Sequence, residues 1–402
     1  MVQGDAILVV DFGNSSTKGA VLFGRDSQTG KFRERQFEVP NAFAPIEDDY
    51  VVSADYNDVT STILSLDTSL GDIKISGNYC NGELQEREKP TFVIKPSAFD
   101  KKYNLEATVL SLRMAFLQAY KAIMNMQRIS DISQIDVRWK VVTLLPPGDI
   151  DEGRAPMEAL IKDITSLDVV FPKMHVDIRV DKVTVLAEGF CGYVAVVYDK
   201  GQIFRRGYEY LKDESVMIFD IGAGTTDCML IKNNKLVQNS KYTVEQGGIN
   251  VLQLVRRQLR LSGLDLDEGD IQAGIIKGYV KDGSKNRDIT SIVNSAKEEV
   301  AGRIVTEFQD YLSLTNIKMR SVGYIIICGG GSMSDEECPQ IIPLSKSISA
   351  MLKRVAPNAE LVSLPKVTVS VDHEDGTVTK EERTMSARML NLIGASILAE
   401  VV

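Results

Sequence analysis

The sequence is poor in the residues from which metal sites and catalytic triads are usually built. It contains two histidines, His175 and His373, and five cysteines that form no Cys-x-x-Cys pair. This shortage argues against a histidine-based metal site or triad. Three of the cysteines, Cys191, Cys228 and Cys328, lie within apolar runs. We therefore expect buried free thiols in a reducing cytosol.

Long apolar runs and an excess of positive charge are absent as well. No stretch approaches the roughly 20 apolar residues that a membrane span needs, and the start, MVQGDAILVV, lacks the basic region of a signal peptide. The chain has 46 Lys and Arg residues against 55 Asp and Glu residues, a formal net charge of -9. Because proteins that coat nucleic acid are basic, we expect no direct nucleic-acid binding, although DNA could be reached through a partner. We expect a cytoplasmic protein without a membrane contact.

What the chain does have is length and a repeated unit. Its 402 residues exceed what one hydrophobic core usually serves, so two domains are expected. Apolar strands alternate with helical patterns, which predicts an α/β fold. A strand, an Asp-x-Gly turn with hydroxyl residues and a second strand occur at 7–23 and again at 216–231.

Other elements are predicted from periodicity and punctuation. Apolar residues at helical spacing predict a long helix that Asn104 caps and another helix over 289–312. A C-terminal helix is expected from about residue 385. Residues 40–100 are irregular, with Pro and Gly punctuation, which favours a small inserted subdomain.

The two repeated turns carry groups suited to phosphate. DFGNSSTKGAVL (11–22) and DIGAGTTDCMLI (220–231) each begin with an Asp that ends a strand, followed by Gly two residues later and then by hydroxyl residues. Glycine permits a tight turn, and the backbone N–H groups of such a turn can bind an anion. A plain β-turn explains either loop alone equally well. Two similar loops, one in each half of the chain, favour a clamp that grips a phosphate chain from both sides.

Charged residues in these turns indicate a metal ion. Lys18 adds a cation that can reach a terminal phosphate. A carboxylate beside phosphates is repelled unless a cation lies between them. Asp11 and Asp220 are therefore predicted to hold Mg²⁺, most simply through its retained waters.

A third glycine cluster lies in the segment 323–333, which is predicted to be a strand. In its part IIICGGGSM, three glycines come directly after the apolar residues and would let a ribose or a flat ring approach the backbone. Taken alone, it is also typical of a flexible loop. Gly247 and Gly248 could close the site, or form the turn that starts a helix. The predicted nucleotide-binding residues of these segments are Gly13, Asn14, Ser15, Ser16, Thr17, Lys18, Gly222, Ala223, Gly224, Thr225, Thr226, Gly247, Gly248, Gly329, Gly330, Gly331 and Ser332.

In this order, the motifs resemble those of the actin, heat-shock chaperone and sugar kinase superfamily. DFGNSSTK looks like its first phosphate loop, DIGAGTTD like its second and IIICGGGSM like its adenosine motif; VTVLAEGFCGYVAV and MLNLIGASILAE look like its connecting segment and closing helix. The resemblance spans nearly the whole chain. It implies an actin-like fold, with two related domains around a nucleotide cleft and a small subdomain inserted in each. The implied bounds are 1–27, 101–214 and 380–402 for the first domain with its insert 28–100, and 215–246 and 290–379 for the second with its insert 247–289.

The resemblance also implies roles for single residues. Glu188 corresponds to the residue next to the γ-phosphate and would orient the attacking water, unless it is only a glutamate in the first turn of a helix. Glu188, Asp220 and Lys18 are thus the predicted catalytic residues. Lys297 lies where the family has its purine-contacting helix, or on a solvated face. Asp227 either assists near the metal or faces solvent. The family favours ATP with Mg²⁺, and GTP stays open because the residues do not show the base.

Among the branches of the superfamily, the length and the insert favour a filament-forming ATPase of the ParM type, which segregates plasmid or phage DNA. Its implied partners are further copies of itself, joined head to tail, and a small DNA-binding adaptor that links the filament to centromere-like DNA. A small-molecule kinase is the alternative, with Asp149 or Asp151 as its base. A protein of cell shape or division similar to MreB or FtsA is another. Neither end of the chain, however, resembles the amphipathic anchors of those proteins.

Overall fold

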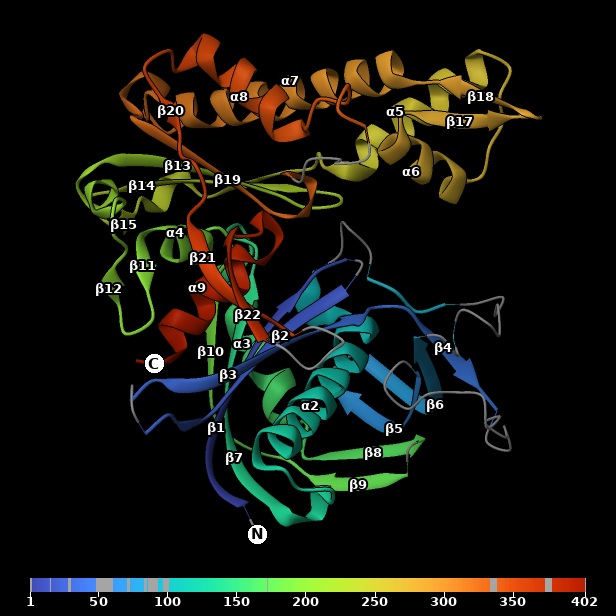
Figure 1. Ribbon diagram of the computed structural model, residues 1–402, viewed down its shortest axis with the longest axis vertical. Helices are drawn as coiled ribbons and strands as arrows, with labels where there is room; N and C mark the ends of the chain where they lie inside the picture. The colour runs from blue at the N-terminus through green and yellow to red at the C-terminus, as the bar shows by residue number, and fades with distance from the viewer. Residues whose placement is uncertain are drawn as a thin grey trace. The chain divides into compact units, whose positions relative to one another are not determined.

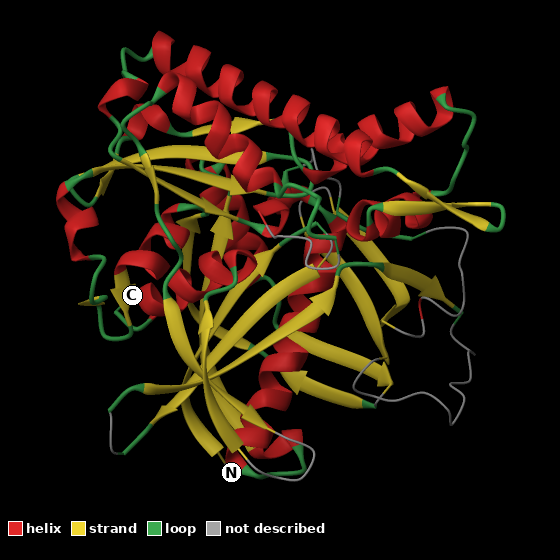
Figure 2. Ribbon diagram, turned by 45° about the horizontal axis from the view of Figure 1, so that its top comes forward, coloured by secondary structure: helices red, strands yellow, loops and turns green. Residues whose placement is uncertain are grey.

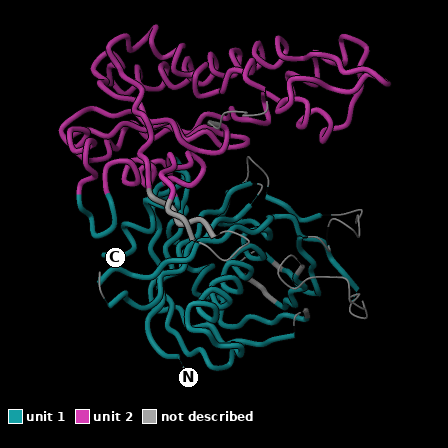
Figure 3. The backbone as a smooth tube through the Cα atoms, in the orientation of Figure 1, with its two compact units in different colours: residues 1–187, 199–203, 392–402 teal, residues 188–198, 204–391 magenta. Residues whose placement is uncertain are grey.

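The computed structural model describes residues 2–14, 16–27, 30–47, 61–70, 73–82, 85, 93–96, 101–171, 173–332, 338–372 and 378–401. The chain forms two compact units, shown in different colours in Figure 3. Unit 1 comprises Met1–Ala187, Asp199–Ile203 and Leu392–Val402, and unit 2 comprises Glu188–Tyr198 and Phe204–Asn391. The domain and subdomain bounds predicted from the sequence stay a prediction.

Unit 1 is built on a five-stranded sheet. Its order is β10 (Arg179–Ala187), β7 (Ile135–Leu145), β1 (Val2–Phe12), β2 (Ser16–Arg25) and β3 (Phe32–Pro40). β7 runs parallel to both β1 and β10, whereas β2 is antiparallel to its neighbours β1 and β3. From Ala6 to Phe12 every residue of β1 is buried, as expected for a strand covered on both faces.

The long helix α2 (Glu106–Gln127) fills the core of unit 1. It contacts β1 and β2 of the first sheet and also β6 and β8 of a second sheet (Figure 2), and all of its residues from 107 to 117 are buried. Trp139 of β7 packs edge-on against α2, and its indole N–H donates to the Tyr120 hydroxyl at 3.1 Å. The predicted cap is wrong. Asn104 ends a separate 3₁₀ turn, and Leu105 occupies the N-cap position without a side-chain hydrogen bond.

A second sheet of unit 1 corrects the prediction that residues 40–100 are irregular. Its order is β4 (Phe43–Ile46), β6 (Ile73–Gly82), β5 (Ser61–Leu70), β8 (Ser166–Phe171) and β9 (Met174–Asp177), and every pair is antiparallel. Serine, threonine and asparagine interrupt the apolar pattern of β5 and β6, which hides it in the sequence. One edge of β5 pairs with β8, about a hundred residues further along the chain, and local patterns cannot reveal that pairing.

Unit 2 repeats the arrangement of strands around its own turn. Its sheet has the order β15 (Lys235–Leu236), β14 (Thr226–Lys232), β13 (Ser215–Ile221), β19 (Tyr324–Cys328) and β20 (Glu360–Leu361), and β16 (Tyr242–Val244) also pairs with β14. β13 is parallel to β19 and antiparallel to β14, as β1 is to β7 and β2. The repeated unit seen in the sequence is therefore a repeated piece of the fold (Figure 1).

The remaining elements are helices and three two-stranded hairpins, β11–β12, β17–β18 and β21–β22. Among the helices, α5 packs on α7, and α7 also packs on α8. The C-terminal helix α9 begins at Leu390, after a 3₁₀ turn at Ala387–Met389. The elements not yet named are α3 (Ile150–Lys162), α4 (Phe190–Val197), α5 (Gly248–Leu261), α6 (Glu268–Lys277), α7 (Thr290–Leu314), α8 (Leu344–Val355), α9 (Leu390–Ala399), β11 (Tyr198–Asp199), β12 (Ile203–Phe204), β17 (Tyr279–Asp282), β18 (Lys285–Asp288), β21 (Lys366–Asp372) and β22 (Val378–Thr384).

Two further observations bear on the sequence predictions. All five cysteines are buried and free, which confirms the predicted free thiols. Within the described part of the chain, no helix has both the length and the apolar character that crossing a bilayer requires.

Candidate functional site

The first predicted phosphate loop is a tight turn between β1 and β2. The backbone N–H of Gly13 donates to the carbonyl oxygen of Ser16 at 3.1 Å, which closes the turn. A Cβ atom at Gly13 would lie 2.8 Å from the same oxygen, so the turn requires glycine there. Asn14 is half-buried at the tip. Ser15, the next predicted residue, lies outside the described residues.

The charged residues of this first loop pair with each other. The strand register places Asp11 directly opposite Lys18, and the Lys18 Nζ atom lies 3.3 Å from Asp11 Oδ2. Both residues are buried, so the pair brings a compensating charge to a carboxylate that would otherwise be costly to bury. The predicted phosphate cation and the predicted metal carboxylate are thus in contact within one hairpin.

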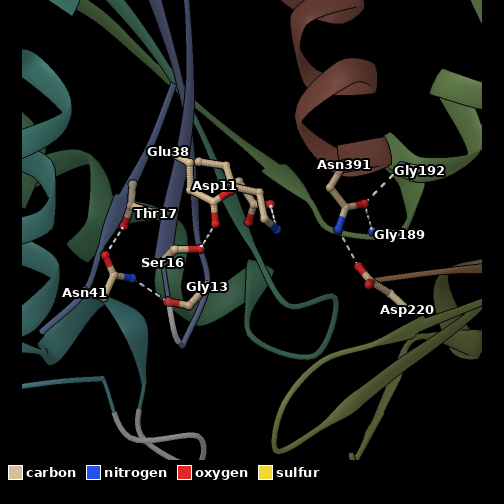
Figure 4. Close-up of polar contacts among 11 residues, drawn as sticks. Asp11, Gly13, Ser16, Thr17, Glu38, Asn41, Gly189, Gly192, Asp220 and Asn391 are labelled. Atoms are coloured by element: carbon tan, nitrogen blue, oxygen red, sulfur yellow. Dashed lines mark hydrogen bonds and ion pairs between the residues drawn. The ribbon is translucent and has the colours of Figure 1, made fainter. Parts of the chain in front are cut away.

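An asparagine that the sequence did not indicate braces the same loop (Figure 4). The amide nitrogen of Asn41 donates to the carbonyl oxygen of Gly13 at 2.5 Å, and its Oδ1 atom accepts from the Thr17 and Ser111 hydroxyls at 2.7 and 2.9 Å. The neighbouring Ser16 hydroxyl donates to Glu38. The hydroxyls of Ser16 and Thr17 therefore already have protein partners, and they fix the shape of the loop.

The second predicted loop has the same geometry. The N–H of Gly222 donates to the carbonyl oxygen of Thr225 at 2.8 Å, as Gly13 does to Ser16, and Ala223 and Gly224 form the tip. Where the first loop has the Asp–Lys pair, however, Asp220 stands opposite Asp227. Two carboxylates on adjacent strands repel each other, so this loop favours a cation from outside the hairpin.

The side chains behind the second loop hold it in place. The Asp227 carboxylate is buried and accepts from the Thr243 hydroxyl at 2.6 Å, so the alternative that it faces solvent is wrong. The fully buried Thr226 donates its hydroxyl to the carbonyl oxygen of Gln246 at 2.8 Å. Thr225 is half-buried at the turn itself.

Gly247 and Gly248 start helix α5 and also pack on the tip of the second loop. The N–H groups of Gly248 and Ile249 donate to the carbonyl oxygens of Gly222 and Ala223 at 3.2 and 2.7 Å. A Cβ atom at Gly247 would lie 2.7 Å from the Ala223 oxygen. The interpretation as the turn that starts a helix therefore holds, and the helix begins against the loop; closure of a nucleotide site by this pair stays a prediction.

The third glycine cluster lies against Asp220. Gly329 follows β19 with φ +86°, and a Cβ atom there would lie 2.4 Å from Asp220 Oδ1. A Cβ atom at Gly331 would lie 2.5 Å from the Ile221 side chain, whereas at Gly330 there is room. Ser332 ends the short 3₁₀ turn that follows. Close packing on the strand that carries Asp220 therefore requires glycine at 329 and 331, whether or not a ligand binds.

The connecting segment brings Glu188 to the same unit. Glu188 is buried and precedes α4, which begins at Phe190 after Gly189, so the alternative of a first-turn glutamate is wrong.

The side chain of Asn391 joins this segment to the second loop (Figure 4). Its Oδ1 atom accepts from the N–H groups of Gly189 and Gly192 at 2.9 and 3.1 Å, and its amide nitrogen donates to Asp220 Oδ2. The one signal for Asn391 in the sequence is that a polar residue interrupts the apolar run MLNLIGASILA.

The electrostatics of this region fit a magnesium ion. Burial raises the pKa of the Cys328 thiol, and the nearby charges of Asp220, Asp227 and Glu188 raise the pKa further. The charges of three carboxylates therefore act on the buried thiol at the end of β19. The described residues hold no group of three ligands that could bind a metal by itself. Mg²⁺ suits such a site because it prefers oxygen ligands and takes few from the protein, the others being water and phosphate.

Three remaining candidates, Lys297, Asp149 and Asp151, belong to other elements. Lys297 is buried on α7, so the alternative of a solvated face is wrong. Asp149, a candidate kinase base, precedes α3 and forms an ion pair with Lys101, which also lies 3.0 Å from Glu152. Asp151 lies in the first turn of α3, where a negative charge is favourable. These contacts give both aspartates a structural explanation.

Solved structures of other proteins share the fold of this chain over 99% of its length. Residues 218–337 match the family model for the archaeal actin homologue MreB-like, C-terminal. A 15-stranded ParM filament from Clostridium botulinum is 16% identical, with 99% of each chain covered and a TM-score of 0.63. The chain has the actin-like fold. This result confirms the fold that the sequence motifs implied.

Two other actin-like structures carry nucleotide. An archaeal actin homolog in complex with ADP is 14% identical, covers 99% of this chain and 100% of its own, and has a TM-score of 0.61. Bacillus thuringiensis ParM with ATP is 15% identical, covers 99% and 98%, and has a TM-score of 0.58. Comparison of the sequence with curated proteins found no match.

The close approach at Gly247 can be tested by adding one methyl group. Gly247→Ala should lower the free energy of unfolding by about 1–3 kcal/mol, because the new Cβ atom would push α5 off the loop. The backbone there is extended, with φ -164°, so conformational strain does not contribute. The control is Gly302→Ala in the interior of α7, where a Cβ atom meets open space and should stabilise by about 0.5–1 kcal/mol. Urea denaturation measures both; equal stabilisation by the two variants would contradict the packing described.

Proposed function

We propose that this protein is an actin-like ATPase of the ParM type, which binds ATP with Mg²⁺ and assembles into filaments. The observation that carries the proposal is the repeated hairpin, in which an aspartate ends a strand and a glycine closes the same turn at 11–18 and at 220–227. The nucleotide in the ADP and ATP complexes of actin-like neighbours supports the same ligand here.

The turns supply what a phosphate chain needs. Backbone N–H groups of Asn14 in the first turn and of Ala223 and Gly224 in the second would donate to phosphate oxygens, and Lys18 would add positive charge. Mg²⁺, when bound, neutralises negative charge on the phosphates. Asp220 would hold it, because its hairpin partner is a second carboxylate, whereas Asp11 already has Lys18.

Hydrolysis would depend on Glu188. Glu188 is buried, and its charge contributes, together with that of Asp220, to the raised pKa of Cys328 at the end of β19. From there it would orient a water for in-line attack on the γ-phosphoryl group. Gly329 and its neighbours would accept the nucleoside, and Lys297 the purine. GTP stays open as a second nucleotide.

The filament is proposed from the architecture. Head-to-tail contacts between unlike faces produce open filaments when the rotation does not close. One of the neighbouring structures is itself a ParM filament. We place the protein in the cytoplasm, with a small adaptor joining its filaments to centromere-like plasmid or phage DNA. The kinase alternative gains no support, since the ion pair with Lys101 explains Asp149.

The assembly is tested by light scattering and negative-stain microscopy at tens of micromolar protein. Filaments and phosphate release should appear with Mg-ATP and fail to appear when EDTA removes the metal, because charge on the phosphates would then be uncompensated. Absence of filaments, together with phosphorylation of a small acceptor, would overturn the proposal in favour of a kinase.

The role of Glu188 is tested by single-turnover phosphate release. Glu188→Ala should reduce the rate by about 100-fold or more, as expected when a residue that handles the reacting water is lost. Nucleotide affinity should change little, because the turns stay intact. The matched control is Glu299→Ala, which removes an exposed glutamate paired with Arg303 on α7. Release at the wild-type rate by Glu188→Ala would remove Glu188 from the mechanism.

A further inference from the structure

Asn391 occupies a special position along the chain as well as in space. The chain enters unit 2 at Glu188 and makes its last departure from it after Asn391. The Asn391 amide hydrogen-bonds Gly189 and Gly192, just beyond the first of these points, and also the Asp220 carboxylate. One buried side chain therefore ties two crossing segments of the chain to the second phosphate loop.

These bonds orient the Asp220 carboxylate directly and hold the backbone next to Glu188. On Asp220, the Asn391 amide engages Oδ2, while Oδ1 faces the backbone of Gly329, where a Cβ atom would lie only 2.4 Å away. The carboxylate plane is thus held from both sides. Gly189 has φ +69°, and its N–H, held by Asn391, belongs to the peptide that leaves Glu188. Loss of the amide would free both groups.

The donor and acceptor ends of the Asn391 amide point to different partners, which indicates a role beyond holding the two glycines in place. Holding the N–H groups of Gly189 and Gly192 requires only an acceptor, and an aspartate would provide one. An aspartate would also place a third negative charge beside Asp220 and Asp227. Asparagine keeps the acceptor and turns a donor toward Asp220, which orients that carboxylate without neutralising it.

We propose that Asn391 is a positioning residue that sets Asp220 for magnesium and Glu188 for water at the same time. This inference rests on the proposed ATPase function and adds a coupling between its two carboxylates. Because one amide holds both the Asp220 carboxylate and the segment that carries Glu188, binding of Mg²⁺ at Asp220 would affect the position of that segment.

Three variants separate positioning from stability. Asn391→Leu removes all three hydrogen bonds at similar size, and Asn391→Asp keeps the acceptor but loses the donor. The matched control is Asn294→Leu in the same unit. Asn294 also donates to a backbone carbonyl, that of Gln340 at 3.0 Å, and accepts from a backbone N–H, that of Ile342 at 2.8 Å, but it does not bond Asp220.

Two measurements without turnover come first. Hydrogen exchange on the nucleotide-free protein should show faster exchange at Gly189 and Gly192 in Asn391→Leu and near wild-type exchange in Asn391→Asp. Calorimetry should show that affinity for ADP in the presence of Mg²⁺ falls by about 10- to 100-fold in both variants, as for other residues that orient metal ligands. Without Mg²⁺ the affinity should change much less. Asn294→Leu should lower the melting temperature and leave both measurements unchanged.

Kinetics then test the coupling. The kcat for ATP should fall by about 10- to 100-fold in both Asn391 variants, and Asn391→Leu should add little to the loss caused by Glu188→Ala, because the two residues act as a unit. Wild-type kcat and magnesium dependence in folded Asn391→Asp would overturn the inference, and this variant decides if Asn391→Leu does not fold. A wild-type protein that hydrolyses no ATP would instead overturn the proposed function.

Discussion

A carboxylate buried at the end of a strand needs compensation, and in this protein that need organises unit 2 around Asp220. The Asp220 carboxylate receives the amide of Asn391 and lies against the backbone of Gly329, with Asp227 on the neighbouring strand. The strands, the glycine cluster and the start of α9 therefore meet at one group. Asp220 and Asp227 face each other across this hairpin, and under the proposed function a divalent cation with its phosphate ligands would balance their charge.

The two hairpins have the same turn geometry but differ in the charged residues that they carry. Each closes through a glycine N–H and a carbonyl oxygen three residues later, and each is braced by an asparagine distant in sequence, Asn41 in unit 1 and Asn391 in unit 2. The first hairpin carries its own cation, Lys18. The second carries two acids. Under the proposed function, the first loop would supply positive charge to phosphate by itself and the second would use a metal ion.

Sequence reasoning succeeded where the signal was local and failed where it was not. The repeated Asp-x-Gly turns are contiguous, so their strands could be predicted, and the resemblance of the motifs in this order to the actin superfamily implied the actin-like fold. The roles of Asn41 and Asn391 could not be predicted. Each forms hydrogen bonds with residues at least 24 positions away, and neither lies in a recognisable motif. The sheet formed by β5, β6 and β8 was missed for the same reason, since its pairing joins residue 63 to residue 171.

The central claim is that Asp220 serves magnesium-dependent nucleotide binding, and calorimetry with Asp220→Ala tests it most directly. ADP is titrated into the wild type and the variant, with Mg²⁺ and with EDTA. The account predicts that Mg²⁺ strengthens binding in the wild type and that Asp220→Ala removes most of this gain, while binding in EDTA changes little. An equal gain from Mg²⁺ in the folded variant would contradict it.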